Sequence, residues 1–264
     1  MSSYNENKIR ICSSIYNDNN KVIELITDNI NENDISILID KLKLSYVNQL
    51  NLSFYEIKNL NELLNTINSL NNINILKITC YHKEDVNLLL NFLKNNKNIT
   101  SFKLNFNYPD YDDDNNDDEY DDDYDEQFKS IQFIDYNLLS DVIKNNNTLK
   151  ILDLGHCLIN DDIKIISDSL KINSSLEEIE LMYNYITNID FIFDVLIVNK
   201  SIKEFSAMQC YIKSVDVSLI YEFIKYNNVI QHIFLNNDKL EYNDSIKNQL
   251  TDINKIKPVL FSYF

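Results

Sequence analysis

The sequence is poor in glycine, proline, arginine and histidine. Its 264 residues include one Gly, two Pro, one Arg, three His and no Trp. A P-loop, a dinucleotide-binding fingerprint and a nucleophile elbow each need several glycines, so a single Gly excludes all three. No His-Glu-x-x-His sequence is present. These absences remove the commonest nucleotide-binding and hydrolytic motifs.

Cysteine is scarce as well, and its spacing gives no sign of a metal or redox site. The four Cys residues include no C-x-x-C pair, and we expect reduced structural thiols. His156 precedes Cys157, which raises the idea of a thiol–imidazole pair. Cys157 is expected to point inward and His156 outward, so the two cannot meet. We therefore predict a protein that is not an enzyme, without catalytic residues, metal or cofactor.

Charge and hydropathy limit the partners further. The formal net charge is −17, and no Lys/Arg stripe is present, so binding to nucleic acid is disfavoured. No stretch of about 18 apolar residues and no basic-apolar leader appears, so we expect no membrane association. An intracellular, cytoplasmic monomer is expected, with the nucleus as the alternative location. Asparagine is abundant, at about forty residues, so Asn-x-Ser/Thr sequences such as that at Asn173 are expected by chance.

One segment carries much of the negative charge. Between Asp110 and Glu126 the chain has twelve Asp or Glu and no Lys or Arg. Like charges at this density resist compaction, which predicts a disordered acidic insert. Its lack of glycine and of regularly spaced oxygens argues against a calcium loop.

A recurring apolar pattern then sets the architecture. In the stretch from Leu149 to Ile159, apolar residues or Cys fall at offsets 0, 3, 5, 8 and 10 from Leu149. This spacing is that of a leucine-rich repeat, in which a short strand is followed by a bend and a return segment. The same frame starts at eight positions: Asn20, Val47, Ile73, Ile99, Leu149, Leu176, Ile202 and Ile230. Most starts lie 26 to 28 residues apart, and apolar residues at helical spacing follow the frames.

The chain resembles the ribonuclease-inhibitor-like leucine-rich-repeat superfamily over roughly residues 20–255. The resemblance implies an α/β solenoid of about eight strand-helix repeats, with parallel strands on the concave face and helices on the convex face. Tyr55 and Tyr81 depart from the pattern, because they stand at offset 8, where Asn or Cys is usual.

The segments predict one domain, since a solenoid grows by stacking. We expect an N-terminal cap at 1–19 and repeats 1–4 at 20–107. The acidic insert follows at 108–126, repeats 4–8 at 127–240, and a C-terminal helix and cap at 241–264. The helix after the insert is predicted to begin near Gln127, and a cap is predicted at Asn160 before the next helix.

The predicted binding surface is the concave face and its loop edge in repeats four to seven. Aromatic residues and Met are enriched at protein interfaces. The predicted partner-binding residues are Phe106, Tyr108, His156, Met182, Tyr183, Tyr185, Met208 and Tyr211. The predicted electrostatic residues are Asp112, Asp113, Asp114, Asp117, Asp118, Glu119, Asp121, Asp122, Asp123, Glu178, Glu180 and Glu204.

These features predict a non-catalytic protein-interaction scaffold whose partner has a basic surface. Two alternatives come from resemblance: a regulator of a small GTPase, as in some members of the superfamily, and a chaperone for basic proteins such as histones, as in acidic leucine-rich nuclear phosphoproteins. Arg10 is the single arginine, so a GTPase-activating role through an arginine finger is nearly excluded.

Overall fold

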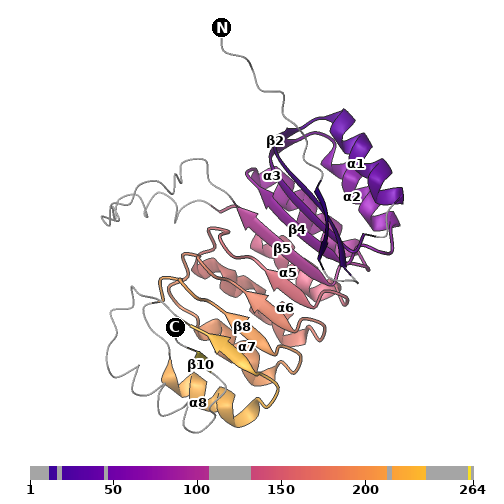
Figure 1. Cartoon of the computed structure of the whole chain (residues 1–264). Helices are drawn as coiled ribbons and strands as arrows, with labels where there is room; N and C mark the ends of the chain where they lie inside the picture. Colours follow the sequence, from indigo (N-terminus) through magenta and orange to yellow (C-terminus); the bar gives the residue numbers. More distant parts are fainter. Residues whose placement is uncertain are drawn as a thin grey trace, which may run out of the picture.

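The structure is a computed structural model of the whole chain, and it describes residues 12–16, 20–44, 47–106, 132–212, 216–235 and 261–262. One sheet runs the length of the molecule, with its strands in sequence order from β1 to β10. β1 pairs with β2 in the antiparallel sense, and the later neighbours pair in parallel. Figure 1 shows the helices as a second layer on one face of this sheet.

The elements alternate along most of the chain. The strands are β1 (Cys12–Tyr16), β2 (Asn20–Ile30), β3 (Gln49–Ile57), β4 (Ile75–Cys80), β5 (Ser101–Phe106), β6 (Ile151–Asp153), β7 (Glu178–Glu180), β8 (Glu204–Ser206), β9 (His232–Phe234) and β10 (Phe261–Ser262). The helices are α1 (Glu32–Leu44), α2 (Leu60–Ser69), α3 (Lys83–Asn95), α5 (Tyr136–Asn145), the 3-10 helix η1 (Asp161–Ile166), α6 (Ser167–Ile172), α7 (Asp190–Val198) and α8 (Val217–Tyr226).

The predicted frames coincide with the parallel strands. In seven of the eight, the strand begins two residues after the start of the frame, as β6 does after Leu149. The apolar positions of the frame point into the core between sheet and helices, where Leu152 is 1% exposed. Parallel strands, outer helices and this repeated inward set confirm the leucine-rich-repeat fold.

The inward pattern nevertheless differs between the two halves of the sheet. In β3, β4 and β5 every second residue is buried through offset 7, which places Phe54, Cys80 and Phe106 inward. In the frames of β6, β7 and β8 the buried set moves to offset 8, at Cys157, Asn184 and Cys210. The longer strands continue the alternation of period two, whereas the shorter ones end in a turn.

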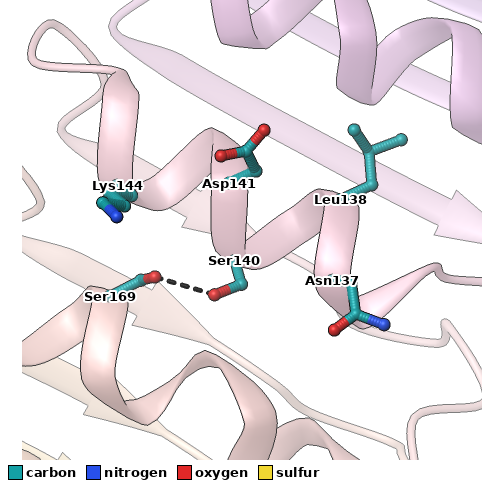
Figure 2. A pocket seen from close by; sticks show the side chains of 6 residues that line it. All are labelled: Asn137, Leu138, Ser140, Asp141, Lys144 and Ser169. Carbon is teal, nitrogen blue, oxygen red and sulfur yellow. Dashed lines mark hydrogen bonds between the residues drawn. The ribbon is translucent and has the colours of Figure 1, made fainter.

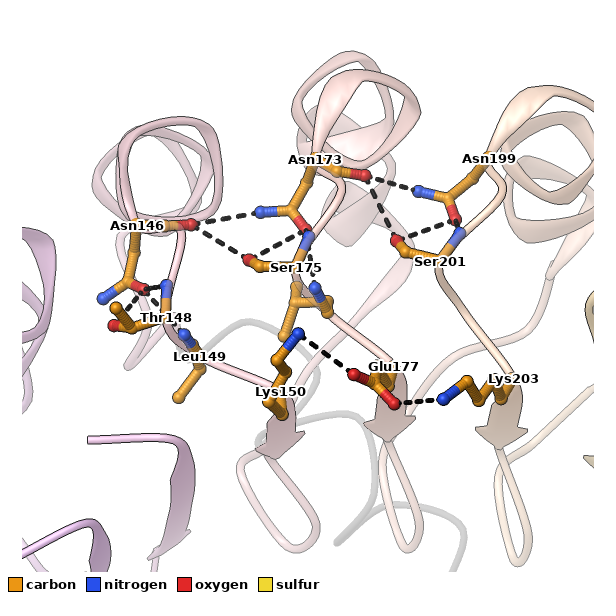
Figure 3. Close-up of polar contacts among 11 residues, drawn as sticks. Asn146, Thr148, Leu149, Lys150, Asn173, Ser175, Glu177, Asn199, Ser201 and Lys203 are labelled. Carbon is orange, nitrogen blue, oxygen red and sulfur yellow. Dashed lines mark hydrogen bonds and ion pairs between the residues drawn. The ribbon is translucent and has the colours of Figure 1, made fainter. Parts of the chain in front are cut away.

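A ladder of asparagines fastens each helix end to the previous repeat, and Figure 3 shows its central part. The amide nitrogen of Asn173 donates to the carbonyls of Ile143 and Asn146, while its oxygen accepts from the backbone of Ser175 and Leu176. Asn146, Asn199 and Asn227 repeat this arrangement. The last carbonyls of a helix have no partner within the helix, so the ladder satisfies groups that would otherwise be buried unpaired.

The ladder changes the interpretation of the Asn-x-Ser/Thr sequences. Asn173 is buried, and the hydroxyl of Ser175 two residues later donates to the carbonyl of Asn146. Ser201 makes the same contact with the carbonyl of Asn173. The Asn173 sequence was expected to arise by chance, but it is part of the repeated structure.

Two helix starts were predicted with mixed success. The described residues from 132 to 135 are not helical, and α5 begins at Tyr136, where the carboxylate of Asp135 accepts from the backbone of Asn137 and Leu138. The prediction of a helix from near Gln127 is therefore wrong for residues 132–135. Asp135 is the N-cap of α5, and an N-cap residue lies outside the helix that it starts. The cap at Asn160 is confirmed, although the first turns form the 3-10 helix η1.

The two ends of the sheet are covered by extra strands. β1 lies along β2, and β10 pairs with β9 through Phe261 opposite Ile233. The acidic insert and the C-terminal helix predicted up to residue 256 lie outside the described residues. Among the described helices, none is long and apolar enough to cross a membrane.

Candidate partner-binding surface

The face of the sheet opposite the helices is built from residues that the strand register aligns in rows. One row passes through Ser101, Ile151, Glu178, Glu204 and His232. The next row passes through Lys77, Lys103, Asp153, Glu180 and Ser206. We call this surface the open face, and the group Asp153, Glu178, Glu180 and Glu204 the acidic patch.

The acidic patch contains two carboxylates that form no ion pair among the described residues, although the charge of Lys103 acts on one of them. Glu178 and Glu180 are two residues apart on the same strand face, and within the described part of the chain neither forms an ion pair. Burial, a hydrogen bond shared with Glu178 and the charge of Asp153 raise the pKa of Glu180 to about 7. A carboxyl in this situation is half protonated near neutral pH, because like charges in close contact disfavour a second ionisation.

The neighbouring charges are already paired. Lys103 Nζ lies 2.5 Å from the Asp153 carboxylate, whose other oxygen accepts from the backbone N–H of Gly155. Glu204 lies 3.3 Å from Nδ1 of His232. Beside the row, Glu177 bridges Lys150 and Lys203, as Figure 3 shows. These pairs leave the two carboxyls of Glu178 and Glu180 as the unbalanced charge of the acidic patch.

Three residues at the edge of this patch adopt a left-handed backbone. His156, Tyr183 and Gln209, all at offset 7 of their frames, have φ values of 56°, 56° and 54°. For residues other than glycine, this conformation has a steric free-energy cost. The turn accommodates the extra residue before the buried Cys157, Asn184 and Cys210, and it directs the side chain at offset 7 away from the core.

The left-handed turns place two aromatic rings in contact at the surface. The rings of His156 and Tyr183 stack with centroids 4.3 Å apart and planes 15° apart. Tyr183 is 49% exposed, and Met182 and Met208 beside it are half-buried. Burial and the charge of Lys103 lower the pKa of His156, so the stack holds a neutral imidazole at neutral pH. We call His156 and Tyr183 the aromatic pair.

Other predicted partner-binding residues are less accessible. Tyr185 stacks on Tyr211 at 5.3 Å but is 9% exposed, while Tyr211 is half-buried. Phe106 is 8% exposed and packs against Phe133 at 3.8 Å. Phe106 was predicted to contact a partner, but β5 is long enough to keep this residue, at offset 7 of its frame, pointing inward. Phe106 therefore offers little surface to a partner.

Some of the remaining predicted site residues lie on the open face, and the others lie outside the described residues. Glu178, Glu180 and Glu204 lie on the open face as predicted. Tyr108 lies outside the described residues, and so do the nine predicted acidic residues of the insert, from Asp112 to Asp123.

Sequence reasoning missed a second aromatic group at the same edge of the sheet. Tyr55 lies 5.0 Å from Tyr81 and 5.2 Å from His82, measured between ring centroids, and it is 44% exposed. Both tyrosines stand at offset 8, where an inward residue was expected. The size of these residues could have located them. A tyrosine at offset 8 does not fit the small buried space that Cys or Asn occupies there, so it is expected at the surface.

The thiols are placed for packing. Cys157 Sγ donates to the carbonyl of Leu104, and burial raises the pKa of this thiol well above its usual value. Burial likewise raises the pKa of Cys80 and of Cys210 to about 12. A thiol needs a lowered pKa to act as a nucleophile. Among the described residues, no group of three or more His, Cys, Asp or Glu is placed to hold a metal ion.

Two of the hollows formed by the described residues lie on opposite sides of the sheet and helix layers. One, of about 440 Å³, opens between α5 and α6 on the helical face, where the hydroxyls of Ser140 and Ser169 are hydrogen-bonded to each other (Figure 2). Asp141 at its rim is already paired with Lys94. The other, of about 300 Å³, lies on the open face over β2 to β5.

No protein-family model matches this sequence, and no curated protein matches it. Solved structures with a similar chain path include the leucine-rich repeat-containing protein LegL7 from Legionella pneumophila. It is 13% identical, with a TM-score of 0.47 over 88% of this chain and 70% of its own. The actin-binding site 2 of leiomodin-1 is 18% identical, with a TM-score of 0.39 over 64% of this chain and 90% of its own. A chain of the yeast Rad7–Elc1 complex is 12% identical, with a TM-score of 0.30 over 89% of this chain and 71% of its own.

Proposed function

We propose that the chain is a non-catalytic scaffold that binds a partner protein with a basic surface. The binding surface consists of the acidic patch on β6 to β8 together with the aromatic pair at its edge. The observation that carries this proposal is the uncompensated carboxyl pair of Glu178 and Glu180. Two carboxyls held together without a cation cost stability, and a Lys or Arg from a partner would remove that cost.

The backbone at the aromatic pair supports the same surface. A glycine would fit the left-handed turns at positions 156 and 183 without strain, yet the chain has His and Tyr there. Strained residues persist where their side chains serve a purpose. Two stacked rings beside half-buried methionines offer the flat apolar contact that typically anchors a protein partner.

The acidic insert would assist association through its charge. It leaves the scaffold after β5 and returns before α5, next to the strand that carries Asp153. Twelve acidic residues would attract a basic partner over a distance limited to about 8 Å at physiological salt. The insert and the acidic patch therefore favour the same class of partner.

Capture of proteins from the source cell, quantified by mass spectrometry, tests the proposal through the bait variants. A bait with Glu178→Gln, Glu180→Gln and Tyr183→Ala should lose a basic protein that the unchanged chain retains. A bait with Glu62→Gln and Glu222→Gln, two exposed acids on the helices, should retain it. If both variant baits recover the basic protein equally well, the acidic patch is not part of the binding surface. Recovery of a small GTPase or a histone would select one of the two alternatives.

A pH series gives an independent check on the same surface. A cation bound at Glu178 and Glu180 lowers the pKa of Glu180 from its raised value, so binding releases a proton. The partner should therefore bind more tightly at pH 8 than at pH 6, and the Glu180→Gln variant should lose most of this difference. A pH dependence unchanged by Glu180→Gln would place the cation elsewhere.

A further inference from the structure

The hollow on the open face differs in charge from the acidic patch beside it. Its charged lining residues are Lys77, Lys103 and Glu24. The polar side chains of Asn51, Thr79 and Asn105 and the exposed Ile26 also line it. These residues belong to β2, β3, β4 and β5, whereas the uncompensated carboxyls belong to β7. The hollow is thus a separate part of the same face. Its last strand, β5, is two strands away from β7, which carries Glu178 and Glu180.

Among the described residues that line this hollow, Lys77 is the cation without an ion pair. It is exposed, and no ion pair to it is formed within the described part of the chain. The strand register places it directly opposite Lys103, and like charges opposite each other are destabilising. Lys103 is paired with Asp153, whereas no acid of the described residues is paired with Lys77. Glu24, the acid that lines the same hollow, is two strands from Lys77 in the same row and accepts a hydrogen bond from Asn51.

Within the described part of the chain, the open face therefore has a positive charge on β4 and a negative charge on β7 that form no ion pair. We infer that it binds an extended segment of the partner that carries both signs, with an acidic side chain at Lys77 and a basic one at Glu178 and Glu180. This inference rests on the proposed function, because it uses the acidic patch as one of its two contact points. A free anion or a nucleic acid is disfavoured, since the neighbouring carboxyls would repel it.

The spacing of the strands sets the spacing in the partner. Neighbouring strands lie about 4.8 Å apart, so the three steps from β4 to β7 span about 14 Å. A segment that crosses the strands in an extended conformation advances about 3.3 Å per residue. Its acidic and basic residues should then stand about four positions apart. The order of the two charges along the sheet also fixes the direction in which the segment lies.

Two unpaired polar atoms lie in strands near the two charged parts of the face. The Oδ1 atom of Asn105 and the Oγ atom of Ser206 are buried and have no hydrogen-bond partner among the described residues. Asn105 lies on β5 and Ser206 on β8, so one atom is near each charged part of the face. Buried polar groups normally find a partner.

A selection experiment tests the inference with a defined probe. Random twelve-residue peptides displayed on phage are selected on the full chain and sequenced. Peptides enriched on the unchanged chain should carry an Asp or Glu about four residues from a Lys or Arg. With Lys77→Ala as the target, the acidic preference should disappear while the basic preference stays. With Glu178→Gln and Glu180→Gln, the opposite should occur. Lys97→Ala, an exposed lysine outside the open face, serves as the matched control.

A charge reversal then tests the contact itself. Lys77→Glu should weaken the best peptide at least tenfold, and exchanging the acidic residue of the peptide for Lys should restore binding. A basic preference without an acidic one would overturn this inference and leave the proposed function standing. If the unchanged chain enriches peptides without a basic preference, or enriches no peptide at all, both the inference and the proposed function are overturned. If the peptide with Lys in place of its acidic residue does not regain binding to the Lys77→Glu variant, the contact at Lys77 is also overturned.

Discussion

At the scale of single residues, the left-handed positions allow a direct test of backbone strain. Gln209 has a φ of 54°, and its side chain is not part of either aromatic stack. Replacement of Gln209 by Gly should remove the steric cost of this conformation and raise the free energy of unfolding by roughly 0.5–1 kcal/mol. Thermal and urea unfolding of the purified variant measure the change.

The matched control is the same substitution at a residue of ordinary backbone. Gln231 is exposed, precedes β9 and is not among the residues with positive φ. Gln231→Gly should lower stability by a similar amount, because glycine gains freedom in the unfolded chain. Two variants with the same sign of effect would show that the left-handed turn carries no strain.

Glu180 should make the stability of the protein fall as the pH rises through neutrality. Its pKa is raised from 4.5 to about 7 in the folded chain, so the folded state holds more protons than the unfolded state between these values. The stabilising effect is complete below about pH 4.5 and is lost as the pH rises through 7. Urea unfolding from pH 5 to pH 8 should show a decline of about 1–3 kcal/mol that Glu180→Gln largely abolishes.

The control for this pH dependence is Glu222→Gln on the exposed face of α8. It should preserve the decline seen in the unchanged chain. Acidic residues whose pKa is lowered by lysine, such as Asp141 beside Lys94, act in the opposite direction but at lower pH. A flat profile in the unchanged chain would mean that the two carboxyls do not share a proton.

At the scale of elements, the asparagine ladder should contribute more than any single exposed contact. Asn173→Ala removes two amide donations and two backbone acceptances from a buried side chain. The carbonyls and N–H groups left behind cannot reach water, so the expected loss is roughly 2–4 kcal/mol. Urea unfolding provides the measurement.

Asn228→Ala is the comparison for this loss, because Asn228 is an exposed neighbour of the ladder residue Asn227. It should change stability by no more than about 0.5 kcal/mol. If Asn173→Ala costs equally little, water has replaced the ladder hydrogen bonds. Conversely, a large loss would fit a chain in which each repeat is stabilised mainly by its neighbours.

The elements also show what the sequence could predict. Leu152, Leu154 and their counterparts located every parallel strand from β2 to β9, because the inward positions of a repeat must be apolar. The end of each strand was less predictable. Whether offset 7 or offset 8 turns inward depends on strand length and on a left-handed turn, and both are set by pairing with the next repeat. Phe106 was therefore assigned the wrong orientation, and the exposed position of Tyr55 was not predicted.

The candidate site was predictable only in part for a related reason. Glu178, Glu180 and Glu204 could be placed on the open face by their offsets. Which charges on this face are paired could not be predicted. Lys103 and Asp153, for example, come from different repeats and meet only through the register of β5 and β6. The free charge of Lys77 follows from the same cross-strand arrangement. Sequence patterns within one repeat carry no information on such contacts.

At the scale of the whole molecule, the scaffold and the acidic insert should act on different steps of binding. Deletion of residues 110–126 should leave the free energy of unfolding nearly unchanged, because the length of a surface loop enters stability only logarithmically. The same deletion removes twelve acidic residues. It should slow association with a basic partner and flatten the dependence of the association rate on salt.

Replacement of Tyr183 or Tyr211 by Ala should instead speed dissociation, by about 1–2 kcal/mol or more for each residue that acts as an anchor. Tyr183 is the more exposed of the two, so its replacement should have the larger effect. Surface plasmon resonance at several salt concentrations separates the two rates. Tyr221, exposed on α8, provides the control, and Tyr221→Ala should alter neither rate. A partner whose rates respond to Tyr221→Ala but not to the other changes binds the helical face.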